Sequence, residues 1–469
     1  MDEISERTTT WSSSENNANN AWNVNMSSGN MNNNNKFSLG RVRSVSALPR
    51  ITFDIPPESV FEAFFDCVRH KMSAPQCAEF CVNYFPKLIA LWQEIREGSY
   101  RPSTSDCFLV SWPTWREIFA AAFRDRIVHH WICLREIPLF EDLYHEIGDV
   151  SFNCRKDYGT LRAVKQFARH IWECSAGYTT DCWILELDIK SFFMSLSKSL
   201  LWEMTEEFLR SRYDGDDLEC LLYLHRTTIF HCPQDDCNRK TPRAWWSNLP
   251  ADKSLFTRDR DTGTAIGNHT AQQWANFYNS VLDYYAVHVL GFEHYIRFVD
   301  DMRIVCRSKM QLLRAVPKIR AFLSDQLLLT LHPKKVHIRH YGQGGRFVGA
   351  VVKKGRIYIS NRTRGALVTK IHRFNALADA GRAEANIEQF VCVINSYYGL
   401  MIHYKTYTLR RKYALWILER WSPYLYFTND FRKAVVKSQY RKLYHVRASI
   451  RKGNISQFFT DPYTLPDED

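Results

Sequence analysis

The stretch that most constrains how this chain can fold is residues 296–305, two short apolar runs with two adjacent aspartates between them. β-forming residues on both sides of Asp300 and Asp301 predict a β-hairpin whose turn carries two negative charges. Like charges held this close are destabilising unless a cation lies beside them. Aspartate pairs at turns are commonly solvated, and the alternative that carries chemistry is a divalent metal ion.

A second stretch strengthens the metal interpretation. Residues 183–188 alternate as a strand does and end on Asp188. If this strand lies beside the hairpin, Asp188 joins Asp300 and Asp301 in an oxygen-rich site that suits Mg²⁺ and substrate phosphate oxygens. Three carboxylates can bridge two ions, Mg²⁺ or Mn²⁺, which together support in-line phosphoryl displacement. We therefore predict that these three aspartates are catalytic metal ligands.

Two neighbours of Asp188 complete this part of the prediction. The backbone carbonyl of Ile189 is expected to be a further metal ligand. Glu186, on the same strand, is expected to lie on the surface.

Three motifs in a fixed order resemble those of reverse transcriptases. Residues 298–301 resemble the (Tyr/Phe)-x-Asp-Asp box, and residues 188–193 resemble the first palm motif. Between them, residues 263–272 resemble the Ile-Gly-Asn-x-x-Ser-Gln segment of the enzymes of diversity-generating retroelements, within the group II intron-like bacterial reverse transcriptases. The resemblance implies an α+β, right-hand polymerase fold with fingers, an antiparallel-sheet palm and a helical thumb.

The same resemblance implies contacts to the incoming nucleotide. Arg155 and Lys156 lie in the fingers segment, where positive charge would clamp the triphosphate. Phe193 matches the steric gate, an aromatic ring that excludes the 2′-hydroxyl and selects deoxynucleotides. Lys334 is expected to bind the nucleotide. Either Lys334 or Lys335 would protonate the leaving pyrophosphate, and the alternative is a plain contact to the phosphates.

A low-fidelity signal lies at Ile266 and Gly267, where more faithful relatives carry Gln-Gly. Isoleucine cannot hydrogen-bond near the template base and nucleotide, so this pair is expected to bind the nucleotide without checking the base pair. His269 and Ala271 depart from the Leu and Ser usual in this segment.

Composition and resemblance together divide the chain into five parts. They are a disordered Asn-rich tail (1–48), a helical N-terminal extension (49–105), the fingers (106–180), the palm (181–360) and a basic helical thumb (361–469). The tail is too poor in apolar residues to fold alone. It also resembles the variable segment of the C-type-lectin-fold proteins that these retroelements diversify, so translated template repeat is an alternative interpretation.

The thumb prediction rests on Arg and Lys clusters that alternate with aromatic residues from residue 361 onward. A solvated helical face would have a similar composition. Such residues also suit the phosphate backbone of a duplex, which is contacted by charge. Residues 395–400 resemble the Asn-Ser-Tyr-x-Gly segment of the family's thumb.

The formal charge of +12 favours a polyanionic partner, with a membrane surface as the alternative. No apolar run reaches the length of a membrane span and the N-terminus lacks a signal peptide pattern, so we expect a cytoplasmic protein. The family resemblance implies a bacterial or phage origin. The 13 cysteines include no paired Cys-x-x-Cys motifs, which indicates reduced thiols. The alternative is one zinc site, built from Cys220, His225, Cys232 and Cys237.

The sequence therefore predicts an RNA-directed DNA polymerase, a nucleotidyltransferase that makes adenine-mutated cDNA from template-repeat RNA in a diversity-generating retroelement. Its expected partners are template RNA, the RNA–cDNA duplex and deoxynucleoside triphosphates, with no membrane. The family resemblance also implies a small basic accessory protein, itself oligomeric. One alternative is a reverse transcriptase of a retron, a phage-defence system or a group II intron. Another, from a different class, is a non-catalytic RNA-binding scaffold.

Overall fold

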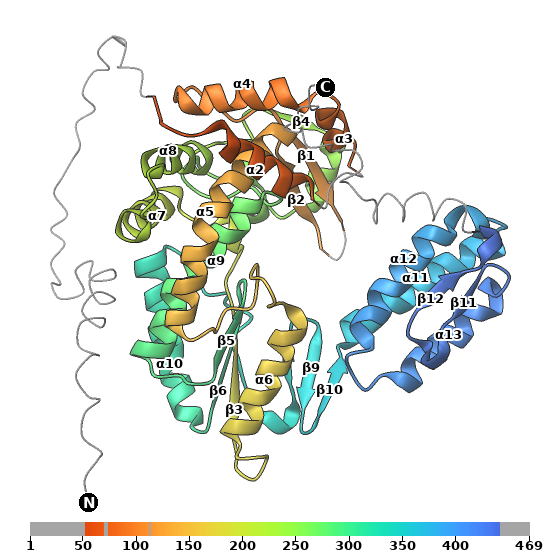
Figure 1. Cartoon of the computed structure of the whole chain (residues 1–469). Coiled ribbons are helices and arrows are strands. Elements are labelled where there is room, and N and C mark those ends of the chain that lie inside the picture. Colours follow the sequence, from red (N-terminus) through yellow and green to blue (C-terminus); the bar gives the residue numbers. More distant parts are fainter. Residues whose placement is uncertain (1–51, 70–73, 112–113, 441–469) are drawn as a thin grey trace, which may run out of the picture. The chain divides into compact units, whose positions relative to one another are not determined.

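The computed structural model describes residues 52–69, 74–111 and 114–440, so the predicted Asn-rich tail lies outside the described residues. The described chain forms two compact units, each assembled from separate segments (Figure 1). The first unit comprises the chain up to Asp149 together with Ile189–Tyr285 and Arg320–Leu331. The second comprises Val150–Asp188, Ala286–Ile319 and the chain from His332 onward. Both helices and sheets are present, which confirms the predicted mixed α+β class.

The first unit is mainly helical, and its N-terminal part follows the predicted helical pattern. Its helices are α2 (Pro57–Val68), α3 (Pro75–Cys81), α4 (Tyr84–Arg96), α5 (Phe123–Ile147), α7 (Lys198–Arg212), α8 (Leu218–Ile229) and α9 (His269–Tyr284). Apolar residues at helical spacing bury Phe64 on α2 and Leu88, Leu91 and Ile95 on α4. A further helix, α10 (Lys309–Leu327), continues through Pro317 and is divided between the units at Arg320.

A small sheet completes the first unit. It has the order β2-β1-β4, with β1 (Ser105–Val110) antiparallel to β2 (Arg116–Ala120) and parallel to β4 (Cys237–Arg239). Cys107 lies opposite Phe119 across β1 and β2, and both belong to a small core with Met194 and Leu255. This core joins segments that are far apart in the sequence.

The second unit contains an antiparallel sheet with the strand order β5-β6-β3-β7. Its strands are β5 (Tyr295–Phe298), β6 (Asp301–Cys306), β3 (Trp183–Asp188) and β7 (His337–His340). A second antiparallel sheet has the order β10-β9-β8, from β8 (Gly345–Phe347), β9 (Ala350–Lys353) and β10 (Arg356–Ile359). The predicted hairpin and the predicted strand at 183–188 are therefore both confirmed.

One face of the four-stranded sheet packs on a core that also includes α6 (Thr160–Cys174) and the second sheet (Figure 1). Ile184 on β3, Ile296 on β5 and Val305 on β6 contribute to this core. Phe167 on α6 meets Phe347 on β8, with ring centroids 5.5 Å apart. The helix α6 and the second sheet, which come from different parts of the sequence, thus cover one face of the sheet that carries the three aspartates.

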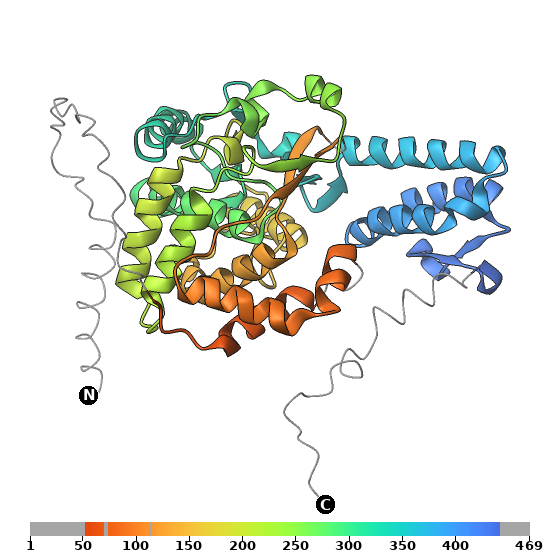
Figure 2. The same ribbon diagram turned by 90° about the horizontal axis from the view of Figure 1, so that it is seen from above.

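The C-terminal part of the second unit is a helical bundle with its own core. Its elements are α11 (Asn361–Asp379), α12 (Ala383–Met401), α13 (Tyr407–Trp421), β11 (Leu425–Phe427) and β12 (Ala434–Val436), drawn in blue in Figure 2. Phe374, Phe390 and Trp421 bring the three helices together at a shared aromatic contact. The helices predicted for the thumb are therefore present.

Asn395 explains part of the Asn-Ser-Tyr-x-Gly segment in structural terms. Its side-chain amide donates to the carbonyl of Ala434 at 2.9 Å and accepts from the Ala434 N–H at 2.8 Å, so it ties α12 to β12. The hydroxyl of Tyr398, three residues on, donates to the carbonyl of Arg410 at 2.8 Å and ties α12 to α13. Both side chains hold the bundle together.

Across residues 52–69, 74–111 and 114–440, no helix combines the length and the apolarity that crossing a membrane would require.

Replacing Asn395 with Ala should loosen the β11–β12 hairpin, because both hydrogen bonds to Ala434 are lost. Each such bond contributes about 0.5–1.5 kcal/mol, so the bundle should lose about 1–3 kcal/mol. Hydrogen exchange of the Ala434 amide, read by mass spectrometry, should become faster in the variant. Ser396→Ala, at the exposed neighbouring position, is the matched control, and equal protection in the two variants would contradict the assigned role.

Candidate active site

The strand register brings two of the three aspartates face to face. β3 and β6 are antiparallel, and Asp188 is paired with Asp301. Opposite residues in an antiparallel pair lie on the same face with Cβ atoms about 4.5–5.5 Å apart. Phe298 on β5 is paired with Asp301, so Val299 and Asp300 alone form the hairpin loop. All three carboxylates thus belong to one edge of one sheet, within the second unit.

The hairpin loop is strained at Val299, which has a φ of +60°. Two-residue hairpin turns need a positive φ at the first central residue, and glycine or asparagine normally supplies it. A β-branched residue in this conformation is an outlier that neighbouring contacts must hold in place. The side chain of Asn153 accepts from the Val299 N–H at 2.7 Å, and the buried guanidinium of Arg297 donates to its carbonyl at 3.1 Å. These contacts fix the backbone that presents Asp300.

Burial and charge together perturb the carboxyl groups. Burial, together with the negative charges of Asp188 and Asp301, raises the pKa of Asp300 to about 6. Burial likewise raises the pKa of Asp301, an effect that the neighbouring Arg303 opposes. The turn therefore concentrates negative charge in a partly dehydrated place, which is the condition that favours a bound cation.

Two side-chain cations already lie against the carboxylates, and they are held differently. Lys335 Nζ donates to both oxygens of Asp188 at 2.8 Å, with the lysine side chain 53% exposed. Arg303 pairs with Asp301, and its side chain is only 7% exposed. Its Nε also donates to the carbonyl of Arg346 at 2.6 Å, which anchors the guanidinium. Lys335 can therefore leave at small cost, whereas Arg303 is a fixed part of the sheet.

The donor set fits Mg²⁺ once Lys335 is displaced, because carboxylate oxygens are the ligands this ion prefers. In the arrangement present, no group of three or more His, Cys, Asp or Glu side chains among the described residues is placed to hold a metal ion. The same finding leaves the zinc alternative without support. His225 instead lies 3.1 Å from the buried carboxylate of Glu136.

The expectation that Glu186 lies on the surface is wrong, since it is only 6% exposed. Its carboxylate accepts from the Arg346 N–H at 3.1 Å and pairs with Arg339 at 3.2 Å. It lies opposite Arg303 in the β3–β6 register, on the face that α6 and the second sheet cover. Glu186 and Arg303 therefore both hold the backbone of Arg346, one at its N–H and the other at its carbonyl.

The predicted phosphate contacts lie in the same unit but differ in exposure. Arg155 is buried, donates to the carbonyl of Ser151 at 3.1 Å and stacks on the ring of Tyr158. Lys156, next to it, is exposed. Lys334 is exposed as well, and its backbone N–H donates to His332 Nδ1 at 3.2 Å. Of the two adjacent lysines, Lys335 is the one whose ammonium contacts Asp188.

The remaining predicted residues belong to the first unit. The Ile266 carbonyl accepts from the Phe119 N–H at 3.0 Å, and the Phe193 carbonyl accepts from the Thr264 N–H at 2.9 Å. Gly267 has a φ of +129°, and a Cβ there would lie 2.8 Å from the Phe119 carbonyl oxygen, so only glycine fits. Ile189 is buried and forms an antiparallel bridge with Leu331. Their roles toward a nucleotide or metal stay predictions.

Sequence reasoning missed Arg303 and Asn153, and it left Lys335 as an alternative to Lys334. A signal for Arg303 was present, because alternate residues of a strand share a face and Arg303 is two positions from Asp301. Asn153 lies about 150 residues before the loop that it holds, and nothing in the local sequence connects them.

No family model and no curated protein matches this chain. Among solved structures, it is similar to an apo telomerase of Candida tropicalis truncated from its C-terminal domain, with 12% identity, 55% of each chain covered and a TM-score of 0.40. For the apo telomerase of the same organism, identity is 10%, coverage 76% of this chain and 68% of that chain, and the TM-score 0.40. For the telomerase of Candida albicans with a fragment of telomeric RNA, identity is 12%, coverage is 69% of this chain and 59% of that chain, and the TM-score is 0.37.

The chain thus spans between about half and two thirds of the length of these telomerases. Similarity at this level carries no argument about activity, and the function is argued from the site itself.

Replacing Asp300 with Asn should stabilise the protein at neutral pH in the absence of divalent ions. A folded pKa of about 6 against 3.8 means that the native state favours the protonated form. The unfavourable contribution of Asp300 is therefore absent below pH 3.8, grows as the pH rises through 6, and reaches at most about 3 kcal/mol. Thermal unfolding in EDTA should show Asp300→Asn melting above the wild type at pH 8 and level with it at pH 4.

The matched control is Asp157→Asn. Asp157 is an exposed aspartate of the same unit, and asparagine tolerates its positive φ. It should melt with the wild type at both pH values. Equal melting of Asp300→Asn and the wild type at pH 8 would show that the turn does not carry the repulsion assigned to it.

Proposed function

We propose that this protein is an RNA-directed DNA polymerase of right-hand architecture, whose palm is the β5-β6-β3-β7 sheet. The observation that carries the proposal is the placement of three aspartates at one sheet edge, with Asp188 opposite Asp301 and Asp300 in the loop beside them. A structural role explains this poorly, since adjacent carboxylates in a dehydrated turn destabilise the fold. A role in binding metal ions and phosphate explains it directly.

In this proposal Asp188, Asp300 and Asp301 hold two Mg²⁺ ions. The bound ions would activate the primer hydroxyl and neutralise charge on the leaving phosphate. Arg303 keeps Asp301 in place and prevents a rotation away from the site, since its guanidinium is anchored on the Arg346 carbonyl. Lys335 moves from Asp188 to the substrate phosphates, where an exposed ammonium on a flexible chain can serve. Lys156 and Lys334, both exposed, contribute further positive charge.

The template–product duplex would contact the helical bundle. Exposed cations line α11 and α13, namely Arg362, Arg364, Arg373, Arg411 and Lys412. Tyr407, at the start of α13, is 51% exposed. Such side chains bind a phosphate backbone with little regard to sequence, and the excess of 12 positive charges on the chain favours the same partner.

The finer assignment, adenine mutagenesis within a diversity-generating retroelement, rests on the loop that contains Ile266 and Gly267. Phe119 holds this loop by its backbone, and Ile266 packs beside the core of Cys107, Phe119, Met194 and Leu255. An apolar side chain there offers no hydrogen bond to a base pair, so mismatches would meet little discrimination.

The test of polymerase activity compares the wild type with Asp300→Asn in cDNA synthesis on a structured RNA template, with any basic accessory protein added. Loss of a metal ligand removes several kcal/mol of transition-state stabilisation, so synthesis should fall by about a thousandfold or more. RNA binding should be unchanged, because the variant alters one residue far from the basic helices in sequence. Asp157→Asn should retain full activity.

A second readout does not depend on activity. Mg²⁺ should raise the melting temperature of the wild type and not that of Asp300→Asn, because a ligand that binds only the native state stabilises it. Synthesis that persists in Asp300→Asn, or an equal response of both proteins to Mg²⁺, would refute the metal assignment.

The fidelity assignment is tested by Ile266→Gln, which restores a hydrogen-bonding side chain. One hydrogen bond contributes about 0.5–1.5 kcal/mol, so errors at template adenines should fall roughly two- to tenfold. Ile266→Val is the matched control, because it changes the volume without adding a polar group. Sequenced cDNA that is faithful in the wild type would instead favour a retron or phage-defence reverse transcriptase.

A further inference from the structure

A buried lysine outside the candidate active site has no counter-charge among the described residues. Lys198, the first residue of α7, is 3% exposed. Its Nζ donates to the carbonyl of His231 at 3.0 Å and to Cys232 Sγ at 3.3 Å. An ammonium has three donors, so these contacts use two of them. Within the described part of the chain, Lys198 forms no ion pair with a carboxylate.

The carboxylates of the surrounding segments are all engaged elsewhere. Asp261, whose backbone carbonyl accepts from the Lys198 N–H, directs its side chain to Ser197 and Ser199 at the start of α7. Asp125, across the pocket, accepts from the Tyr100 hydroxyl at 3.0 Å and the Ser103 N–H at 2.8 Å. The remaining two, each in the loop after His231, bond to partners of their own: Asp235 to Arg260 and Asp236 to Thr104.

Cys232, the second contact of the ammonium, lies among neutral groups. Its Sγ also lies 3.6 Å from the Phe230 carbonyl oxygen and 3.8 Å from that of Arg260. A thiol is neutral and has one hydrogen, which it can donate to either carbonyl oxygen. Burying an ammonium without a compensating charge is costly, so a negative group from outside the described part of the chain is indicated.

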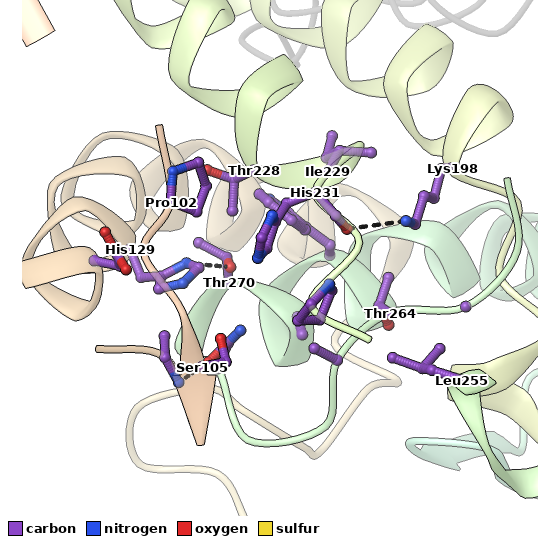
Figure 3. A pocket seen from close by; sticks show the side chains of 18 of the residues that line it. Pro102, Ser105, His129, Lys198, Thr228, Ile229, His231, Leu255, Thr264 and Thr270 are labelled. Atoms are coloured by element: carbon purple, nitrogen blue, oxygen red, sulfur yellow. Dashed lines mark hydrogen bonds between the residues drawn. The ribbon is translucent and has the colours of Figure 1, made fainter. Parts of the chain in front are cut away.

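The ammonium lines a pocket in the first unit (Figure 3). The pocket offers a volume of about 30 Å³ to the centre of a water-sized sphere. On the same measure, a cavity needs about 10–15 Å³ to hold one water. The pocket thus admits a group of a few heavy atoms. Leu255, Ile229 and Trp274 form apolar parts of its wall.

Two further polar groups of the lining lack partners. His231 Nε2 and Thr228 Oγ1 are buried, and neither has a hydrogen-bond partner among the described residues. Figure 3 shows Thr228, His231 and Lys198 along the same side of the pocket, with His129 and Ser105 on the other side. Burial, and then the charge of Lys198, lower the pKa of His231, so its ring is neutral and keeps one N–H to donate. One cation and two unused neutral donors are the complement of an oxyanion.

We propose that this pocket binds a small oxyanion, a phosphate or carboxylate group, with Lys198 as its counter-charge and His231 and Thr228 as hydrogen-bond donors. The site is independent of the polymerase proposal, because every residue that lines it lies in the first unit and none is a predicted catalytic residue.

The test is thermal unfolding of the full chain in sodium chloride, sodium phosphate or sodium acetate at matched ionic strength. Phosphate or acetate should raise the wild-type melting temperature saturably above that in chloride, and the more effective ion identifies the group that the site takes. Lys198→Met, which keeps the length of the chain without its charge, should show no such rise. Lys253→Met, an exposed lysine of the same unit, should respond as the wild type does.

Lys198→Met also tests the buried charge directly. In chloride it should melt level with or above the wild type, since an unpaired buried charge has been removed. If this variant does not fold, Thr228→Val keeps the shape of the side chain and should weaken calorimetric binding of inorganic phosphate or acetate about two- to tenfold. A wild type that responds to neither oxyanion, or a Lys198→Met that keeps the full response, would overturn the proposal.

Discussion

The pairing of Asp188 with Asp301 across two adjacent strands is the interaction on which the rest of the second unit depends. Like charges directly opposite in a sheet destabilise it, so the pair persists only with compensation. Arg303 and Lys335 provide it, one anchored and buried, the other exposed. A slip of one residue would turn Asp301 and Arg303 together to the opposite face, away from Asp188 and Glu186 on β3, so the register, the charges and the hairpin loop are specified together.

Buried charge is handled in two different ways in this protein. Arg303 and Glu186 are buried, and each meets partners within the second unit that satisfy its polar atoms. Asp300 and Lys198 are also largely removed from water, yet the first faces other carboxylates and the second faces neutral groups. Charges of the first kind organise the fold. Charges of the second kind cost stability, and at both places we have proposed a ligand of opposite charge.

Several features could be predicted from local sequence because their cause is local. Apolar residues at helical spacing indicated α2 and α4, and alternation ending on a carboxylate indicated β3. The paired aspartates between apolar runs indicated the hairpin at Asp300. Glu186 was wrongly expected at the surface, because nothing in its own strand reveals that α6 and the second sheet cover that face. The structural role of Asn395 was equally invisible, since its partner, Ala434, lies 39 residues away.

The sequence by itself determined the elements, the three aspartates as candidate ligands and the excess of positive charge, since these follow from composition and short-range periodicity. Only the tertiary structure decided that Asp188 lies opposite Asp301, that Lys335 contacts Asp188, and that Lys198 is buried with no counter-charge in the described part of the chain. Each of these depends on contacts between segments far apart in the chain. Strand register and burial are properties of the packed whole, and no short window of sequence contains them.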